Sequence, residues 1–313
     1  MLHRHPNLRQ RVRSVWRRIW AVAELTNDLR PPVSGHTRLA AVIGDPVRHS
    51  LSPVLMNTAF AATGLDWSYH AFQVAEGNAL GALNAVRALG LEGLSVTMPH
   101  KAAVAGAVDR CTPEAEVLES VNCVTVEAGL LIGHNTDGDG FLGGLAHDAG
   151  TEVAGRNAVV MGAGGAARAV VRALASSGAS DVAVVNRTQE QAEKAAALAG
   201  SVGRVVSKDG LAAVLANADL VINATPLGMA DAGSIADFPV DPELVPVDAV
   251  AVDLIYHPAE TAWMSALRRQ GVEVYGGLSM LVFQAACAFE LWTGKAAPLS
   301  AMEAAARAAL NEG

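Results

Sequence analysis

One segment near the middle of the chain, residues 158–176, constrains the fold more than any other. Its first four residues are all apolar, which indicates a buried strand. They lead into Gly162-Ala163-Gly164-Gly165-Ala166-Ala167, a G-x-G-x-x-A pattern, and then into a helical stretch. The first glycine allows a tight turn, the second lets backbone amides approach a pyrophosphate, and the small Ala167 lets the helix pack on the sheet. A purely structural turn would also favour glycine, but the flanking strand and helix favour a dinucleotide-binding unit.

The end of the next expected strand, residues 182–185, bears on the choice of cofactor. An acidic residue at this place would bond the ribose 2′-hydroxyl of NAD. This chain has Asn186, Arg187 and Thr188 instead, so a guanidinium is available for the 2′-phosphate of NADP. Arg187 could instead be a solvated residue at a helix start, but we favour the phosphate contact. Thr188 fits the cap of that helix in a capping box with Gln191. We expect NADP.

The rest of the chain from residue 37 alternates short β-rich runs with helical stretches, which predicts an α/β fold. Aromatic residues make up only 4% of the chain, so close packing of helices on sheets is favoured over an aromatic-rich sandwich. The 313 residues suffice for two domains. The expected strands are 39–43, 68–74, 94–98, 121–126, 130–133, 158–161, 182–185, 220–223 and 250–254.

Four polar clusters lie at the ends of these strands, where an open α/β sheet places its ligands. They are Ser50 and Ser52, the stretch from Thr97 to Lys101, Asn122, and the stretch from His134 to Asp137. Together they supply hydroxyls, side-chain amides, one ammonium and one carboxylate. Such a set suits a small substrate with several hydroxyls and a carboxylate, because each buried hydroxyl needs a partner.

Lys101 and Asp137 are the candidate catalytic pair. Reduction of a ketone needs hydride at carbon and a proton at oxygen, and a lysine held away from bulk water can exchange that proton. An aspartate beside it would orient the amine. Considered alone, Lys101 could be an exposed residue at a helix start, and Asp137 could be a turn or cap residue. We expect folding to bring the two side chains together.

Several other functions are disfavoured. The histidines, among them His49, His100, His134 and His257, are scattered without metal-ligand spacing, so no metal is expected. The three cysteines contain no C-x-x-C pair, which fits a reducing cytoplasm. The formal net charge is −8, and residues 37–313 alone carry −13, so nucleic-acid binding is not expected. No apolar run is long enough to span a membrane.

The first 36 residues form a basic N-terminal extension. It holds seven arginines against Glu24 and Asp28, a local charge of +5. Residues 7–25 place apolar side chains on one face of an expected amphipathic helix. A membrane-surface helix, an organelle transit peptide and a dispensable start are all compatible with this pattern, and we favour the last.

The motifs together resemble the shikimate dehydrogenase family from about residue 39 to the end of the chain. Nine blocks occur in the family's order: IGDPVRHSLSP at 43–53, VTMPHK at 96–101, SVN at 120–122, NTDG at 135–138, GAGGA at 162–166, NRT at 186–188, NATPLGM at 223–229, DLIY at 253–256 and GGLSMLVFQ at 276–284.

The resemblance implies roles for individual residues. Lys101 and Asp137 would be catalytic. The substrate would contact Ser50, Ser52, Thr97, Asn122, Asp137, Tyr256 and Gln284. NADP would contact Gly162, Ala163, Gly164, Gly165, Ala166, Asn186, Arg187, Thr188, Leu254 and Gly277.

The resemblance also implies an architecture and an activity. We expect a substrate-binding and catalytic domain at 37–138, a Rossmann-type NADP-binding domain at 139–276, and C-terminal helices at 277–313 that return to the first domain. The implied reaction is reversible, NADPH-dependent reduction of 3-dehydroshikimate to shikimate by a cytoplasmic monomer or homodimer. The alternatives are an NAD-using quinate/shikimate dehydrogenase and a non-catalytic NADP-binding regulator on the same scaffold.

One position departs from the family's pattern. The family commonly has asparagine two residues before the threonine of the lysine motif, whereas this chain has Ser95. The shorter side chain leaves room for a different ring substituent, so quinate or an aminated analogue stays open as a substrate.

Overall fold

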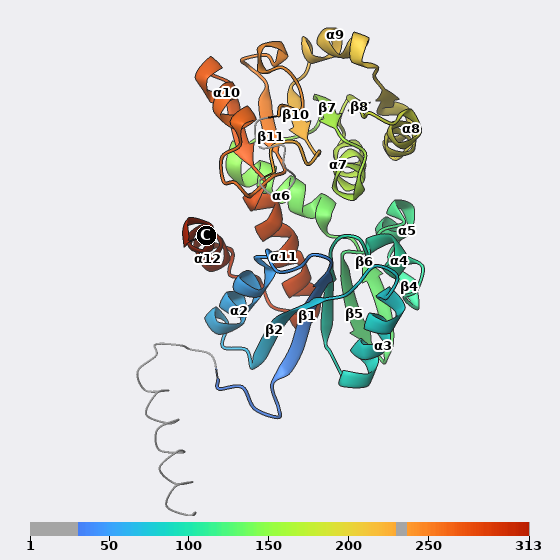
Figure 1. Cartoon of the computed structure of the whole chain (residues 1–313), viewed down its shortest axis with the longest axis vertical. Helices are drawn as coiled ribbons and strands as arrows, with labels where there is room; N and C mark the ends of the chain where they lie inside the picture. Colours follow the sequence, from blue (N-terminus) through green and yellow to red (C-terminus); the bar gives the residue numbers. More distant parts are fainter. Residues whose placement is uncertain (1–30, 230–236, 313) are drawn as a thin grey trace, which may run out of the picture.

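The computed structural model describes residues 31–229 and 237–312, which form two β-sheets connected by long helices. In Figure 1 the two sheets lie one above the other along the long axis, with α6 (Asp137–Ala149) and α11 (Leu278–Thr293) between them. This arrangement confirms the predicted α/β class. The helix expected at 7–25 lies outside the described residues.

The first sheet has six strands in the order β2-β1-β3-β5-β6-β4. Strand β1 pairs in parallel with β2 and β3, and β4 pairs in parallel with β6, whereas β5 is antiparallel to both β3 and β6. The sheet is therefore mixed, because the turn at Gly129 between β5 and β6 reverses the chain. Its strands are β1 (Arg38–Gly44), β2 (Trp67–Gln73), β3 (Gly93–Val96), β4 (Arg110–Cys111), β5 (Cys123–Glu127) and β6 (Leu130–His134).

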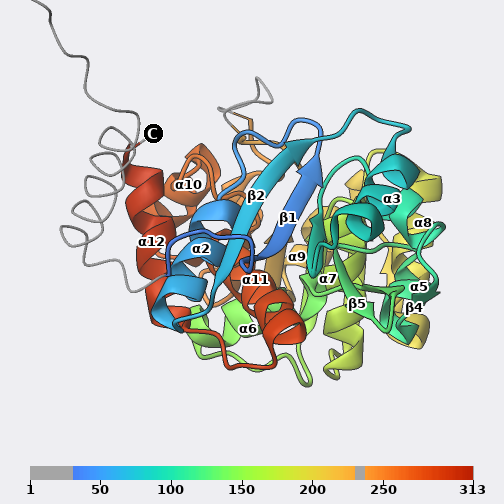
Figure 2. The ribbon, with the colours of Figure 1, turned by 90° about the horizontal axis from the view of Figure 1, so that it is seen from below.

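Helices cover both faces of this sheet. Its buried side chains form two hydrophobic clusters, one beneath α3 and α4 and one shared with α2, α11 and α12. Figure 2 shows α12 beside α2, on the side of β1 and β2 where α11 also lies. The C-terminal helices thus pack on the first sheet. The helices are α2 (Ser52–Ala62), α3 (Ala79–Leu89), α4 (Lys101–Ala105), α5 (Pro113–Leu118) and α12 (Leu299–Glu312).

The second sheet is parallel throughout, in the order β12-β11-β10-β7-β8-β9. Hydrophobic clusters lie on both of its faces, as a parallel sheet requires. The strands are β7 (Asn157–Met161), β8 (Asp181–Val185), β9 (Gly203–Val205), β10 (Leu220–Asn223), β11 (Val250–Asp253) and β12 (Glu273–Gly276). The helices are α7 (Gly165–Ser176), α8 (Gln189–Ala197), α9 (Leu211–Leu215) and α10 (Ala262–Gln270).

The strand order reverses between β7 and β10, which is the position where a Rossmann-type sheet binds its dinucleotide. The glycine turn follows β7 at this point. Gly162 has a φ of +112°, and a Cβ added there would lie 2.7 Å from the carbonyl oxygen of Ala224. Only glycine fits both constraints. Ala167 is fully buried in the cluster beneath α7, as its small size predicted.

No sequence pattern predicts α6, because glycine is a poor helix former and this helix contains Gly138, Gly140, Gly143 and Gly144. The structure supplies the reason for the last three. An added Cβ would lie 2.6 Å from Gln284 Cβ at Gly140, 2.5 Å from Phe283 Cδ1 at Gly143 and 2.9 Å from the Met280 nitrogen at Gly144. The glycines let α6 and α11 approach almost backbone to backbone. Tertiary packing therefore overrides helix propensity here.

Candidate active site

The structure brings Lys101 and Asp137 together although 36 positions separate them. Lys101 begins α4, Asp137 begins α6, and Lys101 Nζ donates a hydrogen bond of 2.5 Å to Asp137 Oδ2. The lysine side chain is 21% exposed and the aspartate side chain 8% exposed. The amine is thus shielded from most of the solvent and remains reachable by a ligand.

Asn122 connects this pair to the surrounding polar side chains. Its Nδ2 donates to the other Asp137 oxygen, Oδ1, at 2.7 Å and to Thr136 Oγ1 at 3.0 Å. Its Oδ1 accepts from the backbone nitrogen of Thr136 at 2.8 Å. Asn135 fixes the backbone of Asp137, because its Oδ1 accepts a hydrogen bond from the Asp137 nitrogen. The Asp137 carboxylate is therefore fixed from both oxygens and from its own backbone.

Gln284 reaches this group of residues from the far end of the chain. Its Oε1 lies 3.5 Å from Asn122 Nδ2, and its backbone oxygen accepts from Thr136 Oγ1 at 3.1 Å. Gln284 is half-buried on α11, where it contacts α6 at Gly140. A glutamine within an apolar helix is explained by this polar neighbourhood.

The hydroxyls expected for the substrate lie around the carboxyl ends of β1 and β3. Ser50 Oγ accepts from the backbone nitrogen of Ser52, and Thr97 packs its methyl group over Gly44. Ser52 is buried, whereas Ser50 and Thr97 are half-buried.

Tyr69 is a polar residue of this region that no sequence pattern singled out. Burial raises the pKa of its hydroxyl well above the usual range, and the neighbouring Ser95 and Ser52 oppose the rise. The hydroxyl is buried beside these two serines. The departure at Ser95 lies beside this hydroxyl.

The glycine turn has the shape needed for a dinucleotide phosphate. A Cβ at Gly164 or Gly165 would meet nothing within 4 Å, so the space above the turn is open. Gly164 caps the N-terminus of α7, where backbone N–H groups and the helix dipole favour an anion. Arg168, in the next turn, has a buried Nε without a hydrogen-bond partner in the described chain. These features fit a bound pyrophosphate.

The expected 2′-phosphate residues follow β8. Arg187 and Thr188 are exposed, and Asn186 Nδ2 donates to the carbonyl oxygen of Thr188 at 3.0 Å. Thr188 occupies the N-cap position of α8, but its side chain accepts no capping hydrogen bond. The predicted capping box is therefore wrong. Arg187 lies in solvent, where a ligand can reach it.

Leu254, Tyr256 and Gly277 lie together beyond β11 and β12. The Gly277 nitrogen donates to the Ile255 oxygen at 3.0 Å, and a Cβ at Gly277 would lie 2.1 Å from the Leu254 oxygen. Leu254 and Tyr256 are half-buried. The structure thus places these residues on the β10 side of the strand reversal and Arg187 on the β8 side.

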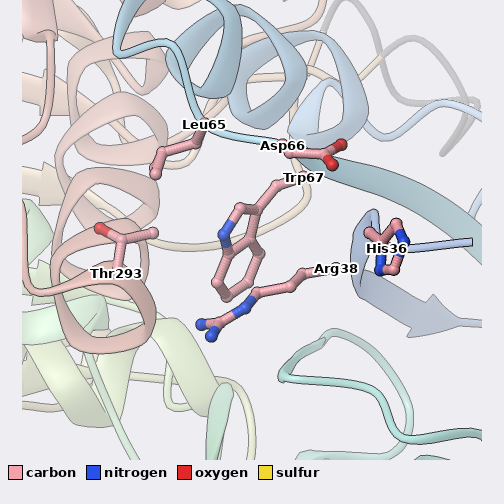
Figure 3. A pocket seen from close by; sticks show the side chains of 6 residues that line it. All are labelled: His36, Arg38, Leu65, Asp66, Trp67 and Thr293. Carbon is pink, nitrogen blue, oxygen red and sulfur yellow. The ribbon is translucent and has the colours of Figure 1, made fainter. Parts of the chain in front are cut away.

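A separate pocket of about 260 Å³ lies at the start of β1 and β2 (Figure 3) and is lined by His36, Arg38, Leu65, Asp66, Trp67 and Thr293. No expected site residue lines it. Its charged groups already have partners, since Arg38 pairs with Glu92 and Asp66 accepts from Thr37. Arg38 also lies 5.7 Å from the centre of the Trp67 ring. We assign no function to this pocket.

Family models match three stretches of the chain. Residues 42–124 match the shikimate dehydrogenase substrate binding domain, residues 144–229 match shikimate / quinate 5-dehydrogenase, and residues 277–307 match the shikimate 5′-dehydrogenase C-terminal domain. Together these matches include most of the candidate site residues.

Individual relatives match nearly the whole chain. The chain is 43% identical over 285 residues to a shikimate dehydrogenase (NADP⁺) of Moorella thermoacetica. This match covers 89% of this chain and 96% of the relative. A crystal structure of a shikimate dehydrogenase with NADP⁺ superposes with a TM-score of 0.82 at 34% identity, covering 89% of this chain and 98% of the other. The shikimate 5-dehydrogenase of Thermus thermophilus, solved with NADP(H) and shikimate, superposes with a TM-score of 0.79 at 39% identity. The match covers 87% of this chain and 99% of the other.

Proposed function

This chain belongs to the shikimate dehydrogenase family, and we propose that it catalyses the reversible, NADPH-dependent reduction of 3-dehydroshikimate to shikimate. The observation that carries the proposal is the 2.5 Å bond between Lys101 and Asp137, which begin two different helices. An amine held by a fixed carboxylate is the proton-exchanging group that reduction of a ketone requires.

Lys101 acts on the substrate oxygen. During reduction its ammonium donates a proton to the oxygen that was the ketone, and during oxidation the neutral amine takes that proton back. Asp137 keeps the amine in place. Asn122 in turn keeps the carboxylate in place by donating from Nδ2 to Asp137 Oδ1. The pair is preorganised, so little of the reaction barrier goes into orienting it.

The substrate is held by side chains around this pair. We propose that Asn122, Asp137, Gln284, Tyr256 and Thr97 contact the ring hydroxyls, and that Ser50 and Ser52 contact the rest of the ring. Their mixture of amide, hydroxyl and carboxylate groups can satisfy a polyhydroxylated ring in a largely buried site.

The cofactor is held on the second sheet. NADP supplies the hydride when bound. The backbone of Gly162, Ala163, Gly164, Gly165 and Ala166 would hold its pyrophosphate, and Asn186, Arg187 and Thr188 would hold its 2′-phosphate. Leu254 and Gly277 would border its nicotinamide end. The open space above the glycine turn and the exposed Arg187 support this assignment.

The remaining expectations are also proposals. We infer that residues 37–138 act as the substrate domain, that 139–276 act as the NADP domain, and that 277–313 belong with the first. We propose a cytoplasmic monomer or homodimer that binds no nucleic acid, consistent with free Cys111, Cys123 and Cys287 and a net charge of −8. None of the helices in the described chain is long and apolar enough to cross a bilayer.

The test is a screen of shikimate, quinate and aminated analogues with NADP⁺ and NAD⁺ at mildly alkaline pH, following reduced cofactor by absorbance. We expect shikimate with NADP⁺ to give the highest kcat/KM. Lys101→Ala should lower kcat by about 10²- to 10⁴-fold, the range for loss of a general acid, while NADP⁺ binding persists. Lys295→Ala, which removes an exposed lysine, is the control. A protein without activity on shikimate with either cofactor would refute the proposal.

A further inference from the structure

Three fully buried polar side chains lie at the carboxyl ends of β10 and β11, outside the expected site. Asn223 and Asp253 are 0% exposed and Thr261 is 1% exposed. Asp253 Oδ1 accepts from Asn223 Nδ2 at 2.9 Å and from the Ile255 nitrogen at 3.2 Å, and Asp253 Oδ2 accepts from Thr261 Oγ1 at 2.7 Å. Burial raises the pKa of the Asp253 carboxyl, and these three donors oppose the rise. Burial of a carboxyl group costs free energy, so we expect this one to have a structural or functional role.

Each bond of this network fixes a loop. Asn223 holds the loop after β10, because its Oδ1 accepts from the Thr225 nitrogen at 3.0 Å and its Nδ2 donates to the Leu227 oxygen at 3.3 Å. Asp253 holds the start of the loop after β11 through Ile255. Thr261 holds its end, where Thr261 also caps α10 by accepting from the Met264 nitrogen at 3.2 Å. One carboxylate therefore links two loops and a helix start.

These loops border one side of the proposed cofactor site. Leu254 and Tyr256 flank Ile255, the residue whose backbone bonds to Asp253. In a sheet of this order the dinucleotide lies across the strand reversal, so its two halves rest on different strands. The adenosine half, with the 2′-phosphate near Arg187, belongs to β7 and β8. The nicotinamide half belongs to β10 and β11.

We propose that Asn223, Asp253 and Thr261 are positioning residues for the nicotinamide half of the cofactor and for Tyr256 at the substrate, and that they leave binding of the adenosine half unaffected. This inference rests on the proposed function. The network touches neither reactant. It acts by holding the backbone from 254 to 256 against Gly277.

The test compares two ligands that differ in the nicotinamide half. Dissociation constants for NADP⁺ and for 2′,5′-ADP are measured by calorimetry, together with KM for shikimate, in Thr261→Val and Asp253→Asn. Misplacement by about 1 Å can cost on the order of 100-fold in rate, so we expect kcat/KM for shikimate to fall at least about tenfold, with a rise in Kd for NADP⁺ and in KM for shikimate. Kd for 2′,5′-ADP should stay within about twofold of the wild-type value, because the β7 and β8 side is unchanged.

Two control variants separate positioning from general support of the fold. Thr261→Ser keeps the hydroxyl and should restore wild-type values. Asp219→Ala removes a half-buried carboxylate at the opposite end of β10, where it accepts from the Asn157 nitrogen at 2.8 Å, and should leave both ligands unaffected. If Asp253→Asn does not fold, Thr261→Val carries the test alone.

The outcomes are distinct. Parallel weakening of NADP⁺ and 2′,5′-ADP would overturn the inference, since it would show that the network merely supports the domain. No change in either ligand would overturn it too. Failure of the wild-type protein to oxidise shikimate would instead refute the proposed function, because that result does not depend on the network.

Discussion

Gly140→Ala adds one methyl group to α6 at its contact with α11 and should destabilise the protein. The new Cβ would lie 2.6 Å from Gln284 Cβ, 2.8 Å from the Gln284 nitrogen and 2.9 Å from the Met280 oxygen. Overpacking of this kind costs about 1–3 kcal/mol, and the upper part of the range applies because two of the three obstructing atoms are backbone. Alanine returns about 1 kcal/mol through its higher helix propensity. The expected net loss is about 1–2 kcal/mol.

The assay is urea unfolding, with Gly81→Ala as the matched control. Gly81 lies in the first turn of α3, is exposed, and has nothing within 4 Å of an added Cβ. That control should gain about 0.5–1 kcal/mol. Gly140→Ala should also raise KM for shikimate, because α11 must move and Gln284 moves with it. Equal stabilisation by both substitutions would refute the argument that close helix contact selects glycine in α6.

Two further predictions concern cofactor choice and pH. We propose that Arg187 makes a charge-assisted hydrogen bond to the 2′-phosphate, and such a bond is worth about 1.5–3 kcal/mol. Arg187→Ala should therefore lower kcat/KM about 10- to 100-fold with NADP⁺ and leave it unchanged with NAD⁺. Equal losses with both cofactors would show that Arg187 is not a phosphate ligand. Burial lowers the pKa of His134, and Glu127 opposes the shift. Below about pH 6.5 the unfolded chain therefore binds a proton that the folded chain resists, and Tm should fall with pH more steeply in the wild type than in His134→Gln. Thermal melts between neutral and mildly acidic pH test this, and parallel curves would contradict it.

The strands were largely predictable because their side chains carry the signal. All nine expected strands occur, since each buries at least one face and therefore carries apolar residues. Strands β4, β9 and β12 were missed, because they are two to four residues long and are defined by pairing rather than by their own pattern. Each of the three also lies at an edge of its sheet.

The sequence predicted the types of residue in the candidate site, but only partly which of them are neighbours in space. Residues at strand ends suggested Lys101 and Asp137, since parallel strands gather their carboxyl ends at one edge. The position of Gln284 followed only from family resemblance, because its neighbour Asn122 lies 162 positions away. Nothing in the sequence reveals the buried link between Asp253 and Thr261, as both residue types are ordinary at a turn.

The described chain passes from one sheet to the other at two places, into α6 and into α11. Asp137 stands at the first crossing and Gly277 at the second. The side chains of α6 join the core of the second sheet, and those of α11 join the core of the first. If the two halves rotate relative to each other, we expect the rotation to turn about these two crossings, and therefore close to the groups that we propose to bind substrate and cofactor.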